Sequence, residues 1–262
     1  MFARPGLPSF DYVRATAAAQ VVELLGEHGP AARLLMGGTD LLPGLREGRI
    51  RPRLVVDVKA VPGLREILYS PGGGLAVGAA VTMNELARHP EVQAHYPLLA
   101  LAAGAVASYQ IRNRATAGGN LCNASPCADL GPAALVLEAG LALEGPDGAR
   151  RLPAAEFLLG PGKTALGPGE FLTGIHFPPP RPGAVARYRK LGRCRSGDLS
   201  LVAVAVLAFA HGTPSGYEFR LGLGSVAPTP IRAREAEALL AAQAPGDDVL
   251  AQAAALARAA AS

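Results

Sequence analysis

The sequence predicts an α+β protein of 262 residues, with strands first and helices packed on one face of an antiparallel sheet. Half of the residues are hydrophobic, which is enough for a sizeable core without metal or disulfide cross-links. Short apolar runs of strand length fill most of the chain, and alanine-rich stretches of helical length end it. A proline cluster at 178–182 separates two expected domains, 1–177 and 183–262, and the first is expected to form subdomains of about 1–58 and 59–177.

The first domain is predicted to mix strands with short helices. Apolar residues at helical spacing predict a helix over 15–27, with Thr16 as its N-cap. Thr82 and Glu85 form a capping box, which predicts the start of another short helix. The apolar run 132–139 could be helix or strand. The remaining elements expected here are strands over 32–36, 54–58, 66–69, 75–81, 141–144, 150–152 and 171–177, and a buried helix over 96–107.

The second domain is predicted to be a small α+β unit with a three-stranded antiparallel sheet. Its strands are expected over 184–191, 199–210 and 217–224, and its two helices over 233–242 and 249–261.

Two segments share a pattern in which an adjacent glycine pair is followed by polar residues, Gly37-Gly38 and Gly118-Gly119. Such a pair allows positive φ and lets a ligand approach the backbone closely. Successive N–H groups in such a turn can point at one anion, so two of these loops could hold the phosphates of a dinucleotide from opposite sides. A short helix over 41–48, capped by Thr39 or Asp40, is expected to follow the first loop. An ordinary glycine turn is the alternative for either pair taken alone.

Composition excludes several classes of protein. The net charge is only +4, the basic residues are scattered and aromatic residues make up 5%, so nucleic acid is not an expected partner. Cys122, Cys127 and Cys194 are too few for a disulfide framework and have no metal-site spacing, which favours a reducing compartment and no bound metal. We find no signal peptide and no apolar run of the ~20 residues that a membrane span needs. A cytoplasmic protein is therefore expected.

Two glycine-rich motifs imitate nucleotide-binding fingerprints without meeting their requirements. The run 160–164 resembles a phosphate-binding loop, but Phe157 stands where the first glycine is required. The run 222–227 resembles a dinucleotide fingerprint, but Pro228 and Pro230 prevent the helix that must follow. No nucleophile–base arrangement or carboxylate pair is apparent, so we predict no catalytic residue. The densest basic stretch, 188–198, is either a solvated strand end or a source of one cation that faces a ligand.

Taken together, the motifs make the sequence resemble the FAD-binding medium subunits of the molybdenum hydroxylases, the family of xanthine dehydrogenase and carbon monoxide dehydrogenase subunits. The resemblance implies a two-part FAD-binding domain of the PCMH type followed by a small α+β domain. The motifs that carry it occur in family order at 36–43, 110–113, 116–129, 160–164, 190–198 and 224–232.

The resemblance also implies which residues hold FAD. Both Gly-Gly loops would hold its pyrophosphate, the carboxylate of Asp129 would hydrogen-bond the cofactor, Leu172 would meet its flavin or adenine end, and Lys190 would lie near the isoalloxazine. The full predicted set is Leu35, Met36, Gly37, Gly38, Thr39, Asp40, Leu41, Thr116, Ala117, Gly118, Gly119, Asn120, Asn123, Asp129, Leu172 and Lys190.

The function implied by the resemblance is electron transfer within a heterotrimer. An iron–sulfur small subunit would receive electrons from a molybdenum-cofactor large subunit and pass them to FAD, which would reduce an acceptor such as NAD or a quinone. This fits the lack of a catalytic residue, because the cofactor itself carries the redox chemistry. Two alternatives remain, a stand-alone FAD-dependent oxidoreductase, which should show an acid or base facing the flavin, and a non-catalytic nucleotide-binding module.

Overall fold

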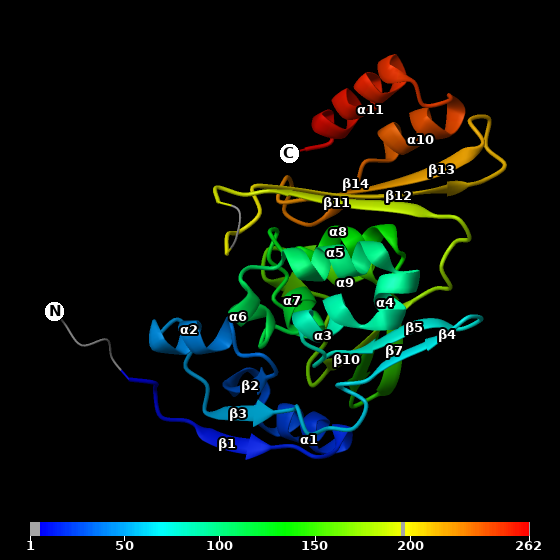
Figure 1. Cartoon of the computed structure of the whole chain (residues 1–262). Coiled ribbons are helices and arrows are strands. Elements are labelled where there is room, and N and C mark those ends of the chain that lie inside the picture. The colour runs from blue at the N-terminus through cyan, green and yellow to red at the C-terminus, as the bar shows by residue number, and fades with distance from the viewer. Residues whose placement is uncertain (1–5, 195–196, 262) are drawn as a thin grey trace.

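A computed structural model describes residues 6–194 and 197–261. The described chain forms three layers, which Figure 1 shows one above another. A small parallel sheet lies at the N-terminal end, a five-stranded antiparallel sheet with several short helices lies in the middle, and a four-stranded antiparallel sheet carrying two helices lies at the C-terminal end. The predicted α+β class is confirmed.

The N-terminal layer is a three-stranded parallel sheet of order β1-β3-β2. The helix predicted over 15–27 begins three residues later, because Ala15 continues the strand pairing through its N–H to the carbonyl of Asp57 at 2.9 Å. Thr16 is therefore not the N-cap, which is Ala17. The elements of this layer are β1 (Asp11–Arg14), α1 (Ala18–His28), η1 (Gly29–Ala31), β2 (Ala32–Leu35), α2 (Leu41–Arg46) and β3 (Leu54–Asp57).

The middle layer is built on the antiparallel sheet β4-β5-β10-β6-β7. Its largest buried side chains include Phe157 and Phe177, and its helices cover one face of the sheet. The strands are β4 (Ile67–Ser70), β5 (Gly74–Gly78), β6 (Gly140–Gly145), β7 (Gly148–Pro153) and β10 (Phe171–Phe177), with the small pair β8 (Leu158–Gly160) and β9 (Lys163–Thr164). The helices are α3 (Met83–Arg88), α4 (Pro90–His95), α5 (Pro97–Ala105), α6 (Tyr109–Arg112), α7 (Ala117–Cys122), α8 (Leu130–Val136) and α9 (Ala154–Phe157).

The structure confirms one local prediction in the middle layer and decides another that the sequence left open. The capping box is confirmed, since the hydroxyl of Thr82 accepts from the N–H of Glu85 while the Glu85 carboxylate accepts from the N–H of Thr82 at 2.8 Å. The run 132–139, which could be helix or strand, lies mostly in α8. None of the helices in the described part of the chain is long and apolar enough to cross a membrane.

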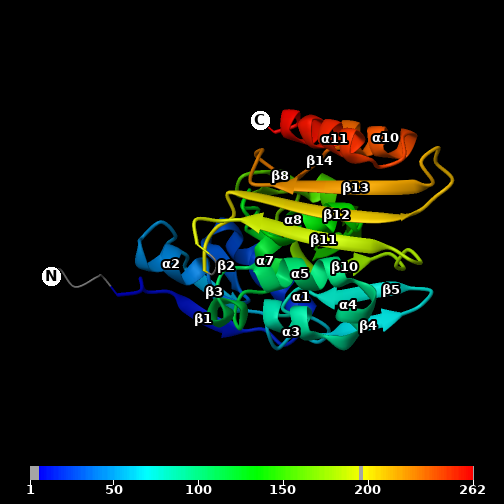
Figure 2. The same ribbon diagram turned by 45° about the horizontal axis from the view of Figure 1, so that its top comes forward.

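The C-terminal layer has four strands where three are predicted. The additional strand pairs only Ile231 and Arg232 with β13, so it is too short for an apolar run to reveal. The elements are β11 (Val185–Leu191), β12 (Val202–Ala210), β13 (Tyr217–Gly224), β14 (Ile231–Arg232), α10 (Arg234–Ala242) and α11 (Asp247–Ala259). Figure 2 shows the two helices on the outer face of this sheet, while its inner face lies over α5 and α8 of the middle layer.

Candidate functional site

The two Gly-Gly segments, far apart in sequence, lie against each other. A methyl group on Gly37 would stand 2.1 Å from the carbonyl oxygen of Arg114, so the first loop touches the backbone that leads into the second segment. The hydroxyl of Thr116 also points at the sulfur of Met36, at 3.9 Å. Only glycine fits such a close approach of two backbones. The site therefore lies where the N-terminal layer meets the middle layer.

The first loop leaves a row of backbone donors unused. Gly38 has a φ of +75°, the left-handed conformation that the glycine pair predicts. Within the described residues, no group accepts a hydrogen bond from the backbone N–H groups of Gly37, Gly38, Thr39 or Asp40. These groups precede α2, whose N-cap is Asp40, one of the two residues predicted for that position, although its side chain makes no capping hydrogen bond. Adjacent free N–H groups form a site suited to an anion such as a phosphate.

The second segment is built differently from our prediction. Gly118 and Gly119 lie in α7 rather than in a turn, and neither has a positive φ. The N–H groups of Ala117 and Gly118 donate to the carbonyls of Val81 and Ala79, each at 2.9 Å. The N–H group of Gly119 donates to the hydroxyl of Thr116, the N-cap of α7, at 3.1 Å. This segment therefore has no nest of free N–H groups.

Glycine is nevertheless required in α7 for packing. A Cβ on Gly118 would lie 2.6 Å from the Cβ and 2.7 Å from the carbonyl oxygen of Ala79, just after β5. On Gly119 it would lie 2.8 Å from the hydroxyl of Thr116 and within 4 Å of no other group, and Gly119 itself is half-buried. What α7 can offer a ligand is this half-buried backbone and the side chain of Asn120, whose Oδ1 accepts from the N–H of Leu130 at 3.4 Å.

A buried polar cluster joins the middle layer to the C-terminal layer beside α7. Asp129 is 4% exposed. Its two carboxylate oxygens accept hydrogen bonds from the Tyr188 hydroxyl at 2.8 Å and from the Lys190 ammonium at 2.9 Å. Lys190 also donates to the carbonyl of Ala105 at 3.0 Å. Two of the predicted site residues, Asp129 and Lys190, are thus brought into direct contact.

Burial and charge oppose each other in this cluster. Burial raises the pKa of Asp129, and the hydrogen bonds from Lys190 and Tyr188 oppose this shift only in part. Burial and the adjacent carboxylate raise the pKa of Tyr188 far above its ordinary value, so its hydroxyl stays protonated and donates. Because folding raises the pKa of Asp129, the contribution of Asp129 to the free energy of unfolding is greatest below about pH 3.9. This contribution is lost as the pH rises through the pKa of the folded state.

The remaining predicted residues lie at different depths. Leu172, in β10 beside a β-bulge, is 1% exposed and belongs to the main core, so it presents no surface to a ligand in this structure. Leu35, Met36 and Leu41 are half-buried around the first loop, and Asn123 is exposed at the end of α7.

Sequence reasoning missed the residues that hold these elements in place. The buried amide of Asn84 donates to Asn113 at 2.7 Å and accepts from the Arg112 guanidinium at 3.1 Å. Arg112 also donates to the carbonyl of Val106 at 2.8 Å. This network fixes α6 and hence the backbone of Arg114 that supports Gly37. The motif at 110–113 contains two of these residues, but its pattern assigns them no role.

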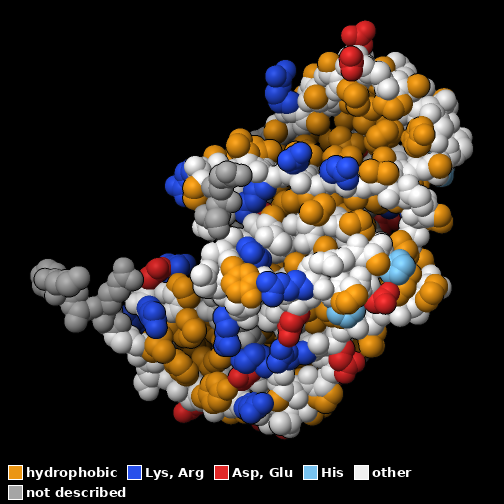
Figure 3. All heavy atoms as spheres, in the orientation of Figure 1, with side chains coloured by type: hydrophobic (Ala, Val, Ile, Leu, Met, Phe, Trp, Pro, Cys, Tyr) orange, Lys and Arg blue, Asp and Glu red, His pale blue; other side chains and the backbone are white. Residues whose placement is uncertain are grey.

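The structure shows the environment of Cys122 and the distribution of charge on one face of the surface. In the described chain, no three His, Cys, Asp or Glu side chains are grouped to hold a metal ion. Burial raises the pKa of the Cys122 thiol to about 12, which disfavours the thiolate that a metal would need. On the face in Figure 3, Lys and Arg side chains are spread over all three layers and interspersed with apolar groups. Two cavities of about 290 Å³ lie away from the Gly-Gly segments.

Comparison with known proteins agrees with this geometry. Residues 8–180 match the family model for the FAD binding domain in molybdopterin dehydrogenase, and residues 186–262 match that for the CO dehydrogenase flavoprotein C-terminal domain. The xanthine dehydrogenase FAD-binding subunit of Escherichia coli O157:H7 is 38% identical over 228 residues, covering 86% of this chain and 77% of the relative. The carbon monoxide dehydrogenase medium chain of Hydrogenophaga pseudoflava is 36% identical, with the same coverage of 86% and 77%.

Solved structures give the same result. The chain superposes on carbon monoxide dehydrogenase from H. pseudoflava, in a form that lacks the Mo-pyranopterin moiety, with a TM-score of 0.92 and 35% identity over 98% of this chain and 89% of the other. The fold and the matched models define a flavoprotein subunit of an oxidoreductase, with FAD as its cofactor. The chain belongs to the family of FAD-binding medium subunits of the molybdenum hydroxylases, and the predicted family is confirmed.

We predict that Tyr188→Phe lowers the free energy of unfolding by ~1–2 kcal/mol, because it leaves one oxygen of the buried Asp129 without its donor. Urea unfolding measures this. Tyr217→Phe is the matched control, since the exposed Tyr217 hydroxyl makes no hydrogen bond within the described chain. Equal losses in the two variants would show that the Tyr188 hydroxyl does not support the cluster.

Cys122 should resist alkylation in the folded protein. With a pKa of about 12, its thiolate fraction at pH 8 is about a thousandfold below that of an ordinary cysteine. Iodoacetamide labelling followed by peptide mass spectrometry should show Cys122 reacting at least a hundredfold more slowly in the native protein than in urea, on the order given by this thiolate fraction. Similar rates in both conditions would contradict the assigned environment.

Proposed function

We propose that this chain is the electron-transfer subunit of a molybdenum-containing hydroxylase or dehydrogenase. In this proposal it receives electrons from an iron–sulfur small subunit that serves a molybdenum-cofactor large subunit, and passes them to an external acceptor such as NAD or a quinone. The observation that carries the FAD site is the row of unused backbone N–H groups at 37–40, held beside α7. Bound FAD supplies the redox chemistry, and the protein supplies its binding and orientation.

The proposed roles differ between the two Gly-Gly segments. Residues Gly37, Gly38, Thr39 and Asp40 donate their N–H groups to the pyrophosphate, with Leu35, Met36 and Leu41 forming the apolar base of the loop. The second segment contributes the half-buried backbone at Gly119 and the polar side chains of its neighbours. Ala117 and Gly118 act as packing residues, because their N–H groups are used by carbonyls near the end of β5. The neighbouring polar side chains proposed to contact FAD are Thr116, Asn120 and Asn123.

The polar cluster is proposed to orient the flavin end of the cofactor. Asp129 has one hydrogen bond on each oxygen, and a carboxylate can accept further donors. Lys190 is anchored to Asp129 and Ala105, so its charge is held in one place near the junction of the layers. Leu172, fully buried here, contacts FAD in this proposal only if β10 shifts next to its bulge.

The same proposal includes the domain boundaries of the protein. We place the domain boundaries at 1–177 and 183–262, with subdomains of about 1–58 and 59–177. The separation of the three larger sheets and the proline-rich connection after β10 support this division. We further propose that the chain is part of a heterotrimer in the cytoplasm. The low, odd number of cysteines favours such a reducing compartment.

Gly37→Ala should weaken FAD binding at least about tenfold, the factor that 1.4 kcal/mol represents. The added methyl collides with the Arg114 carbonyl, so the free N–H groups must move. Flavin fluorescence quenching measures the affinity. Gly104→Ala is the matched control, since nothing lies within 4 Å of a Cβ there. If both variants fold and bind FAD equally well, the first loop does not hold the cofactor.

The isolated FAD-loaded chain should not oxidise purines, aldehydes or carbon monoxide, because in this proposal the molybdenum-cofactor subunit oxidises the substrate and this chain only passes on the electrons. Addition of purified iron–sulfur and molybdenum subunits should allow turnover with an artificial acceptor. Turnover by the lone chain at about 1–10³ s⁻¹, the usual range for enzymes, would instead favour the stand-alone flavoenzyme.

A further inference from the structure

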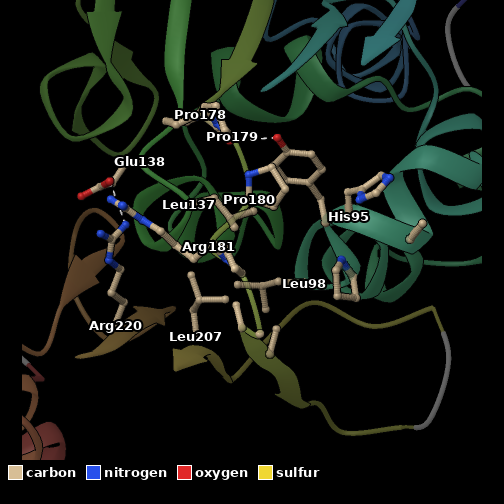
Figure 4. A pocket seen from close by; sticks show the side chains of 17 residues that line it. His95, Leu98, Leu137, Glu138, Pro178, Pro179, Pro180, Arg181, Leu207 and Arg220 are labelled. Atoms are coloured by element: carbon tan, nitrogen blue, oxygen red, sulfur yellow. Dashed lines mark hydrogen bonds and ion pairs between the residues drawn. The ribbon is translucent and has the colours of Figure 1, made fainter. Parts of the chain in front are cut away.

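A cavity of about 290 Å³ lies on the junction between the middle and C-terminal layers, outside the residues proposed for FAD. Its walls come from the start of α5, the turn after α8, the linker that follows β10, and the inner face of the C-terminal sheet (Figure 4). Leu137 and the prolines of the linker make the accessible walls apolar, and the buried Leu98 and Leu207 lie behind them. Apolar cavities between domains, with a few polar groups, are the usual form of small-molecule sites.

Two guanidinium groups lie at one end of this cavity, on the side of Glu138 in Figure 4. The guanidinium carbon of Arg181 lies 5.4 Å from the centre of the Phe209 ring, and that of Arg220 lies 5.1 Å from it. Both guanidinium groups therefore contact the same aromatic ring. Cation–π contact of this kind holds a guanidinium in place without neutralising its charge.

The two arginines differ in how their charge is compensated. Arg220 has a side chain only 6% exposed and forms ion pairs with Glu138 at 2.8 Å and with Glu218 at 2.7 Å. Arg181 forms no ion pair with any carboxylate in the described residues. Burial raises the pKa of Glu218, but the hydrogen bond and the charge of Arg220 lower it. The charge of Arg181 lowers it further by a smaller amount, so the pKa is lowered overall. Arg181 is therefore the cation left available at the apolar cavity.

We propose that this cavity binds a small organic monocarboxylate, with its carboxylate on Arg181 and its apolar body against Leu137 and the prolines of the linker. A guanidinium can bind a carboxylate through two parallel hydrogen bonds. The nearby carboxylates of Glu138 and Glu218 disfavour more highly charged anions such as phosphate. The volume lies at the small end of ligand sites, about 300–1,000 Å³, which suits a molecule of one ring.

Benzoate tests this proposal on the 262-residue chain by isothermal titration calorimetry, with and without saturating FAD. Wild type should bind one benzoate per chain in both conditions. Arg181→Gln should weaken binding at least about tenfold, the loss of a charge-assisted hydrogen bond. The matched control is Arg189→Gln, an exposed arginine of β11 outside the cavity, which should bind like wild type. Unchanged unfolding midpoints establish that both variants fold.

Two further probes separate the parts of the proposed ligand. Benzyl alcohol keeps the ring but lacks the charge, and inorganic phosphate has the charge but lacks the ring, so each should bind at least about tenfold more weakly than benzoate. The proposal is overturned if wild type shows no saturable benzoate binding, if Arg181→Gln binds as well as wild type, or if either probe binds as tightly as benzoate. Benzoate binding that FAD abolishes would also overturn it, because the ligand would then occupy the cofactor site.

Discussion

The docking of residues 115–119 against the end of β5 is the constraint on which the rest of the site depends. The N–H groups of Ala117 and Gly118 bind the carbonyls of Val81 and Ala79, and the N–H of Met83 binds the carbonyl of Ala115. These hydrogen bonds leave no space for a Cβ at Gly118. They also fix the preceding backbone, against which the first Gly-Gly loop packs at Gly37. One segment thus connects the parallel sheet to the middle layer and determines where the free N–H groups point.

A second junction, the Asp129 cluster, couples this segment to the C-terminal layer. A buried carboxylate is costly unless it is paired and hydrogen-bonded, and here Lys190 and Tyr188 meet both conditions from β11. The cluster therefore favours one placement of the C-terminal sheet over α5 and α8.

The sequence predicts the local features of this site better than its long-range ones. The positive φ of Gly38 and the capping box at Thr82 depend on neighbouring residues, and both predictions are confirmed. The turn predicted at Gly118 is wrong, because the N–H groups of Ala117 and Gly118 donate to carbonyls just after β5, more than thirty residues earlier in the chain. Tyr188 was missed for a related reason, since its partner Asp129 is 59 positions away. A single sequence shows that Gly118 must be small, but not which backbone requires it.

Hydrogen–deuterium exchange of the backbone N–H groups, with and without FAD, tests the central claim most directly. In the free protein, the N–H groups of Gly37 to Asp40 should exchange rapidly, because nothing in the described chain accepts their hydrogen bonds. FAD should protect them strongly. Those of Ala117 and Gly118 should exchange slowly in both states, because the carbonyls of Val81 and Ala79 already accept their hydrogen bonds. Protection by FAD at 117–118 with none at 37–40 would contradict the assignment of the first loop as the cofactor's phosphate site.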